Sequence, residues 1–270
     1  MLSHGGVTSL PPPERMKLRF PFRPQQLLSV IGGALLLGAA AQAQDTIILK
    51  TGAAQQGKVI GVTPSGQLEF QVAGTTNKLG LALNQVGEVR MTPPPEYAQA
   101  YGAYTAKDYP KALTLMKSVA DRFKGMPSPW AQQATSMMGE LYILTDDLPK
   151  AEAAYNDFKR LYPTGGSLQS EVGLSRLAIA KKDYATAKQK LEPITDAALK
   201  EKIINPNNAL AYSQAFLVSG QVKEAEGNLS GALEDYLRTV TLFYHDRTAV
   251  ASAQERANAL REAHKEVTVP

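Results

Sequence analysis

Two pairs of neighbouring carboxylates, Asp146 with Asp147 and Glu234 with Asp235, are the side chains best suited by type to acid–base chemistry. Such chemistry needs two carboxyl groups whose pKa values are pushed apart in one enclosed pocket. The first pair falls in a turn between two expected helices, and the second on the charged face of an expected helix. We interpret both pairs as solvated surface, so neither predicts a catalytic centre.

Histidine and cysteine chemistry is sparse. The chain has three histidines, His4, His245 and His264, and no cysteine. A thiol nucleophile, a disulfide and a lipid-anchored N-terminal cysteine are therefore excluded, and the two later histidines do not have the spacing of a metal site. No Gly-x-Ser-x-Gly elbow or phosphate-binding loop is present. We expect a protein that is not an enzyme and that needs no metal or cofactor.

The N-terminal region has the three parts of a secretory signal peptide. Residues 16–19 are basic, residues 27–41 form an apolar run, and residues 41–43 read Ala-Gln-Ala, a small-residue cleavage site. We expect residues 16–43 to be a signal peptide that is cleaved after Ala43. Residues 1–15 are then an upstream extension, which leaves Met1 and Met16 as alternative starts, and an uncleaved N-terminal anchor is the alternative to cleavage.

Removal of the signal peptide would lower the net charge of the protein, and the net charge bears on which partners it can bind. The whole chain carries a formal charge of +4, and residues 1–43 contribute four basic side chains and one acidic one, so the remainder is close to neutral. Nucleic-acid binding needs a basic surface that neutralises phosphates. We therefore expect an exported, periplasmic or otherwise extracytoplasmic protein, with no nucleic-acid partner and no transmembrane segment after cleavage.

Residues 44–92 predict a small β-module. Apolar residues alternate with a period of two at Leu68, Phe70 and Val72, and turn residues separate five such short runs. So many short strands predict a closed or nearly closed barrel. The opening, Asp45 to Gly52, resembles the start of small Sm-like or SH3-like barrels in secreted bacterial proteins. The prolines within residues 93–96 predict a stiff hinge.

Residues 97–270 contain one three-part pattern four times: a Tyr or Leu, an alanine three residues later, and a large side chain four residues after the alanine. The copies are Tyr109, Ala112 and Met116; Leu148, Ala151 and Tyr155; Tyr184, Ala187 and Leu191; and Leu229, Ala232 and Tyr236. The second copy also has Gly139, Tyr142, Phe158 and Pro163, and Gly220 precedes the fourth. These residues resemble the tetratricopeptide-repeat family, in which they pack paired helices together.

The spacing of the four copies predicts the rest of the helical part. The copies are further apart than the family's repeats, so we expect loops at residues 125–129, 164–167 and 205–208. A last helix, capped by Asp246, would close the stack. The expected fold is therefore α+β, with a five-stranded barrel, a helical solenoid of about four helix pairs and a C-terminal capping helix.

The resemblance also implies where a partner would bind. By the family's register, eight side chains line the inner, concave face of the solenoid: Tyr97, Tyr101, Tyr104, Gln133, Met137, Glu140, Gln169 and Arg176. Tyrosine offers a large rigid contact area with a polar tip, which suits a binding anchor. The alternative for each tyrosine is simple packing against the barrel or the next helix.

Three functions remain open on these grounds. We expect an exported, non-enzymatic scaffold that binds another cell-envelope protein or peptide on the concave face. A factor that binds or processes peptidoglycan or another carbohydrate is the first alternative. Structural self-assembly through the barrel edges, which would give a homo-oligomer, is the second.

Overall fold

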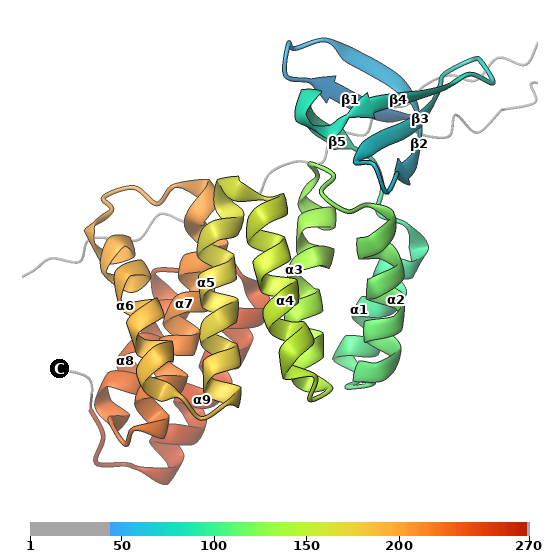
Figure 1. Cartoon of the computed structure of the whole chain (residues 1–270). Helices are drawn as coiled ribbons and strands as arrows, with labels where there is room; N and C mark the ends of the chain where they lie inside the picture. The colour runs from blue at the N-terminus through green and yellow to red at the C-terminus, as the bar shows by residue number, and fades with distance from the viewer. Residues whose placement is uncertain (1–43, 269–270) are drawn as a thin grey trace, which may run out of the picture. The chain divides into compact units, whose positions relative to one another are not determined.

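A computed structural model describes residues 44–268 of the chain. Over this range the chain forms five strands followed by nine α-helices (Figure 1), which confirms the α+β class. No helix in the described range is long and apolar enough to cross a membrane. The signal peptide, its cleavage site after Ala43 and the extension 1–15 lie outside the described residues.

The five strands form one antiparallel sheet in the order β4-β3-β2-β1-β5. The alternation of apolar and polar residues along the strands places the core on one face of the sheet, because every second side chain of a strand faces the same side. Leu68 and Phe70, predicted from this alternation, are fully buried. The strands are β1 (Asp45–Leu49), β2 (Ala54–Val62), β3 (Gln67–Val72), β4 (Lys78–Ala82) and β5 (Val86–Arg90).

The sheet is open, so the prediction of a closed barrel is wrong. Among the described residues, β4 and β5 are the end strands and do not pair with each other. A short 3-10 helix, η1 (Leu83–Gln85), leads from one to the other. On the free edge of β5, the Val89 amide donates to the Pro127 carbonyl at 2.9 Å. The helical part therefore occupies the edge that a closed barrel would pair with β4.

The helices follow one another as four pairs and a final helix, and each packs on its predecessor. The number of pairs agrees with the prediction. Asp246 caps the final helix by accepting the backbone amides of Thr248 and Ala249 at 2.9 and 3.1 Å. The helices are α1 (Pro95–Thr105), α2 (Tyr109–Arg122), α3 (Pro129–Leu144), α4 (Leu148–Leu161), α5 (Pro163–Ala180), α6 (Tyr184–Lys200), α7 (Pro206–Ala225), α8 (Leu229–Thr241) and α9 (Arg247–Ala263).

The same turn joins the two helices of every pair. One residue has a positive φ and ends the first helix, and the next residue caps the second helix with its side-chain oxygen. The residues with positive φ are Lys107, Asp146, Lys182 and Gly227. The caps are Asp108, Asp147, Asp183 and Asn228. The four copies of the sequence pattern thus share one local structure, in which Tyr109, Leu148, Tyr184 and Leu229 are the first residues of the second helices.

The residues predicted to pack the repeats lie between the paired helices. The four alanines of the pattern are fully buried: Ala112, Ala151, Ala187 and Ala232. Tyr155 and Tyr236 are buried four residues further on, Phe158 is buried and Tyr142 is partly buried. A Cβ atom on Gly139 would lie less than 3.0 Å from the Tyr155 ring, and one on Gly220 would lie equally close to Tyr236. The glycines are therefore required for close approach of the helices.

Two of the three predicted loops are helical. Residues 164–167 belong to the first turns of α5, and residues 206–208 to the first turn of α7, which Asn205 caps. In both helices proline is the first residue, where its missing amide has no cost. Gly166 allows close packing, because its Cβ would lie 2.9 Å from the Tyr162 side chain. Residues 123–128, which overlap the third prediction, do join α2 to α3.

The proline segment predicted as a hinge begins the first helix. Pro94 is the N-cap of α1, and Pro95 is its first residue. A continuous hydrophobic cluster includes Phe70 and Val89 of the sheet together with Met116 of α2. The sheet and the first helices therefore share apolar packing across residues 93–96.

Candidate functional site

The first helices of the pairs lie side by side. Helix α3 packs on α5, α5 packs on α7, and hydrogen bonds between side chains join α1 to α3. We call the surface on this side the first-helix face. It contains the predicted residues on α1 (Tyr97, Tyr101, Tyr104), α3 (Gln133, Glu140) and α5 (Gln169, Arg176), together with Gln214 on α7.

The amide of Gln133 links two of the tyrosines. The Tyr97 hydroxyl donates to Gln133 Oε1 at 2.8 Å, and Gln133 Nε2 donates to the Tyr101 hydroxyl. The two tyrosine rings are in contact, with centroids 5.3 Å apart. Burial raises the pKa of both hydroxyls above the ordinary value. Both therefore stay protonated and remain hydrogen-bonding groups at any physiological pH.

A second chain of polar groups crosses three helices. The Tyr104 hydroxyl donates to Glu140 Oε1 at 2.6 Å, and Arg176 Nη1 lies 3.7 Å from Glu140 Oε2. Burial raises the pKa of Tyr104 well above its ordinary value, and the nearby Glu140 carboxylate raises it further. Burial works to lower the pKa of Arg176, but Glu140, Tyr155, Tyr104 and Asp246 together more than offset this effect, so the pKa is raised. The face thus has an ordered polar strip across α1, α3 and α5.

Gln214 extends the face to α7 and was missed in the sequence. Its Nε2 donates to Asp246 Oδ2 at 2.7 Å, so the capping residue of α9 also borders the face. Gln133 and Gln214 each precede a glycine of the repeat pattern, Gly139 and Gly220, by six residues. That shared position is a sequence signal that would have identified Gln214.

The structure separates one predicted residue from the others. Met137 is buried in the hydrophobic cluster and offers little surface to a partner. Gln133 is exposed, whereas Gln169, Arg176 and the tyrosines are half-buried. Side-chain amides and hydroxyls present both donors and acceptors. An arrangement of this kind can hydrogen-bond the peptide groups of an extended chain.

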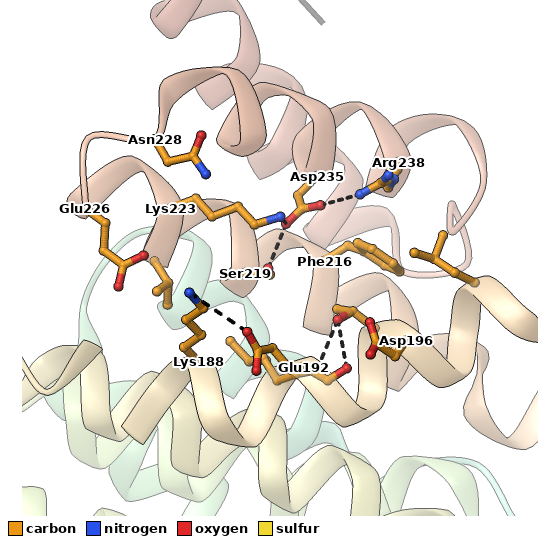
Figure 2. Close-up of a pocket in the computed structure, with 14 residues that line it drawn as sticks. Lys188, Glu192, Asp196, Phe216, Ser219, Lys223, Glu226, Asn228, Asp235 and Arg238 are labelled. Carbon is orange, nitrogen blue, oxygen red and sulfur yellow. Dashed lines mark hydrogen bonds and ion pairs between the residues drawn. The ribbon is translucent and has the colours of Figure 1, made fainter. Parts of the chain in front are cut away.

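A cavity of about 230 Å³ lies between α6, α7 and α8 (Figure 2), and none of the residues named for the first-helix face lines it. Asp235 lies at its inner side with only 1% of its side chain exposed. The interpretation of Glu234 and Asp235 as solvated surface is therefore wrong for Asp235. The turn of α8 that carries Asp235 faces α7, so the burial of this side chain depends on how the two helices pack.

Three donors hold the Asp235 carboxylate. Ser219 Oγ donates to Oδ2 at 2.7 Å, Lys223 Nζ lies 2.6 Å from the same oxygen, and Arg238 Nη1 donates to Oδ1 at 2.9 Å. Arg238 also pairs with Glu234. Because Asp235 is saturated by these partners, we interpret it as the centre of an ion-pair network that joins α7 to α8. Within the described range, no cluster of three His, Cys, Asp or Glu side chains has the geometry of a metal site.

No protein-family model matches the chain, and no curated protein sequence matches it either.

Proposed function

We propose that this protein is an exported, non-enzymatic scaffold of tetratricopeptide type, and that its first-helix face binds an extended segment of another cell-envelope protein. The signal-peptide pattern of residues 16–43 supports export. The recurring helix pairs and their shared turn support the repeat assignment. The observation that carries the binding role is the polar strip of tyrosine, glutamine, glutamate and arginine across α1, α3 and α5.

Two properties of that strip favour a polypeptide ligand. Its tyrosines are held in place before binding by contacts with Gln133 and Glu140, so little side-chain freedom is lost when a partner docks. A glutamine amide has two N–H donors and an oxygen with two lone pairs, so Gln133 keeps one donor and one acceptor site beyond its bonds to Tyr97 and Tyr101, which matches the peptide unit. A partner in extended conformation would contact successive helices with successive residues.

Site-specific photo-cross-linking in the native envelope tests this proposal. A photoreactive residue at Gln133, which is exposed on the first-helix face, is expected to give an adduct with one partner protein. The same residue at Gln189, which is exposed on α6, is the matched control and is expected to give none. Tyr101→Ala should lower the adduct yield, because losing an aromatic anchor costs about 2 kcal/mol or roughly thirtyfold in affinity. Equal adducts from both positions would contradict the proposal.

Self-association through β4 is a second candidate function, favoured by the open sheet. In the described part of the chain the outer edge of β4 has no strand partner. Leu79 on this strand is 44% exposed. An unpaired edge with an exposed apolar side chain can pair with the same strand of another copy.

Light scattering would reveal such an oligomer. Leu79→Lys is expected to convert it to a monomer, because lysine on an edge strand opposes pairing. Leu144→Lys is the control, since Leu144 is 40% exposed but lies at the end of α3. A wild-type monomer, or equal effects of the two substitutions, would rule out assembly through β4.

A further inference from the structure

A second hollow, of about 380 Å³, lies between the sheet and the end of α2. We call it the basic hollow. It is lined by the cations Lys58, Lys78 and Arg122, by the amide of Gln71, and by apolar side chains that include Met91 and Phe123. Three strands and one helix therefore contribute to it, and none of its lining residues is acidic.

Strand register brings the two lysines together. Lys58 on β2 is directly opposite Gln71 on β3, and Gln71 is directly opposite Lys78 on β4. Directly opposite residues of antiparallel strands project from the same face of a sheet. Because neighbouring strands are about 4.8 Å apart, the Cα atoms of the two lysines are roughly 10 Å apart, within the reach of two extended lysine side chains. Both ammonium groups can therefore contact one ligand.

Arg122 lines the hollow from the helical side, opposite the lysines of the sheet. It is the last residue of α2, and its guanidinium lies 4.6 Å from the centroid of the Phe123 ring. Among the described residues, Glu96 is the acidic group at ion-pair distance, with Oε2 at 3.7 Å from Nη2, which is too long for a hydrogen bond. A Cβ atom on Gly61 of β2 would lie 2.9 Å from the Arg122 carbonyl. The close approach that this glycine allows brings the end of α2 against the sheet.

The charge of the hollow is unbalanced within the described structure. Lys58 and Lys78 make no ion pair with any described acidic side chain, and Arg122 has Glu96 at ion-pair distance, so the three cations face one described carboxylate. Like charges that face one another repel, and an anion between them removes the repulsion. The cations also have apolar walls beside them, which strengthen their attraction for an anion relative to open water.

We propose that the basic hollow is a binding site for a compact oxyanion, a phosphate or carboxylate group carried by a ligand. Lys58, Lys78 and Arg122 would share its charge, and Gln71 would donate to one of its oxygens. This site is separate from the first-helix face and goes beyond the proposed scaffold function. It gives the sheet module a ligand of its own.

Isothermal titration of the chain that begins at residue 44 with inorganic pyrophosphate and, separately, with citrate tests the site. Wild-type protein is expected to bind at least one of them, and the tighter of the two distinguishes a phosphate source from a carboxylate source. The double variant Lys58→Gln/Lys78→Gln should bind about 100-fold more weakly, because each charge-assisted contact is worth roughly tenfold. Binding should also weaken as salt is added.

The matched control is Lys200→Gln/Lys202→Gln, which removes the same charge from exposed positions at the end of α6. It should change the affinity by less than about threefold, because neither lysine lines the hollow and exposed charges are screened by salt. Equal weakening in both double variants would show that net charge alone attracts the anion and would overturn the proposal. Failure of the wild type to bind either pyrophosphate or citrate would also overturn the proposal. The wild type and both double variants should have the same melting temperature, which shows that the substitutions leave the fold intact.

Discussion

Gly173→Ala is expected to lower the free energy of unfolding by about 2 kcal/mol, although alanine is the better helix former. Propensity alone would favour alanine in a helix by about 1 kcal/mol. The new methyl carbon, however, would lie less than 3.0 Å from the ring of Tyr155. Overpacking of this kind costs about 1–3 kcal/mol and sometimes more. We expect the high end, because the ring is enclosed between Gly173 of α5 and Gly139 of α3.

Gly102→Ala is the matched control for that substitution. Gly102 is also helical, in α1, but a Cβ atom there would meet nothing within 4 Å. This variant should gain up to about 1 kcal/mol of stability from propensity alone. Urea unfolding followed by circular dichroism measures both changes. If Gly173→Ala were as stable as Gly102→Ala, the close packing of α3, α4 and α5 around Tyr155 would be wrong.

A double variant identifies the ring as the cause. In a Tyr155→Leu background the aromatic ring is absent, so Gly173→Ala should cost much less than in the wild type. The two substitutions should therefore be non-additive by about 1 kcal/mol or more. Simple loss of helix stability would instead give additive effects.

The sequence could locate Tyr155 and Gly139 but not the role of Gly173. The pattern around Ala151 predicts which side chain packs between the helices of one pair, because those residues are close along the chain. The contact between Gly173 and Tyr155 depends on how the next pair docks. At the equivalent position of Gly139 the third unit has Ser175, so the glycine of the third unit that contacts the ring, Gly173, lies outside the repeat pattern.

The errors in the strand and loop predictions have different origins. Alternation predicts the strands of the sheet from local sequence, but it does not show that the edge of β5 is bonded by the Pro127 carbonyl, from the connection between α2 and α3. Residues 164–167 read as a loop because glycine is usually a breaker. In the structure Gly166 lies in the first turns of α5 and packs against Tyr162, the N-cap of the same helix, four residues earlier.

The candidate site was predictable where it follows the repeat register. Tyr97, Tyr104, Gln133 and Glu140 are brought together as hydrogen-bonded neighbours. Asp235 was misjudged, because the charge of its neighbour Glu234 suggested a solvated face. Lys223 was the available signal, since it occupies the position that Tyr142 has in the second unit. A lysine at a packing position predicts a buried acidic partner.

Asp235→Asn is expected to destabilise the protein by about 3 kcal/mol. The substitution keeps the size of the side chain but leaves Lys223 and Arg238 without the carboxylate that joins them. Breaking a buried ion pair from one side costs about 3–5 kcal/mol, because the remaining charge is not compensated. We expect the low end, since both cations line the cavity between α6, α7 and α8 and are partly exposed there.

Asp157→Asn separates the effect of burial from that of pairing. Asp157 also pairs with two cations, Lys124 at 3.2 Å and Arg160 at 2.9 Å, but 46% of its side chain is exposed. Exposed pairs contribute about 0–1 kcal/mol, so this variant should lose no more than that. The small loss of stability should vanish in 1 M salt, where the Debye length is about 3 Å. The loss caused by Asp235→Asn should persist, because a buried pair is screened much less.

A compensating substitution then tests the network itself. If the uncompensated lysine is the main cost, adding Lys223→Met to Asp235→Asn should restore about half of the lost stability, because an apolar side chain can replace a buried ion-pair partner. Arg238 keeps Glu234 as its partner in that double variant. Guanidinium unfolding of the single and double variants measures the recovery. A double variant less stable than Asp235→Asn alone would mean that Lys223 stabilises the packing of α7 and α8 by contacts other than its pair with Asp235.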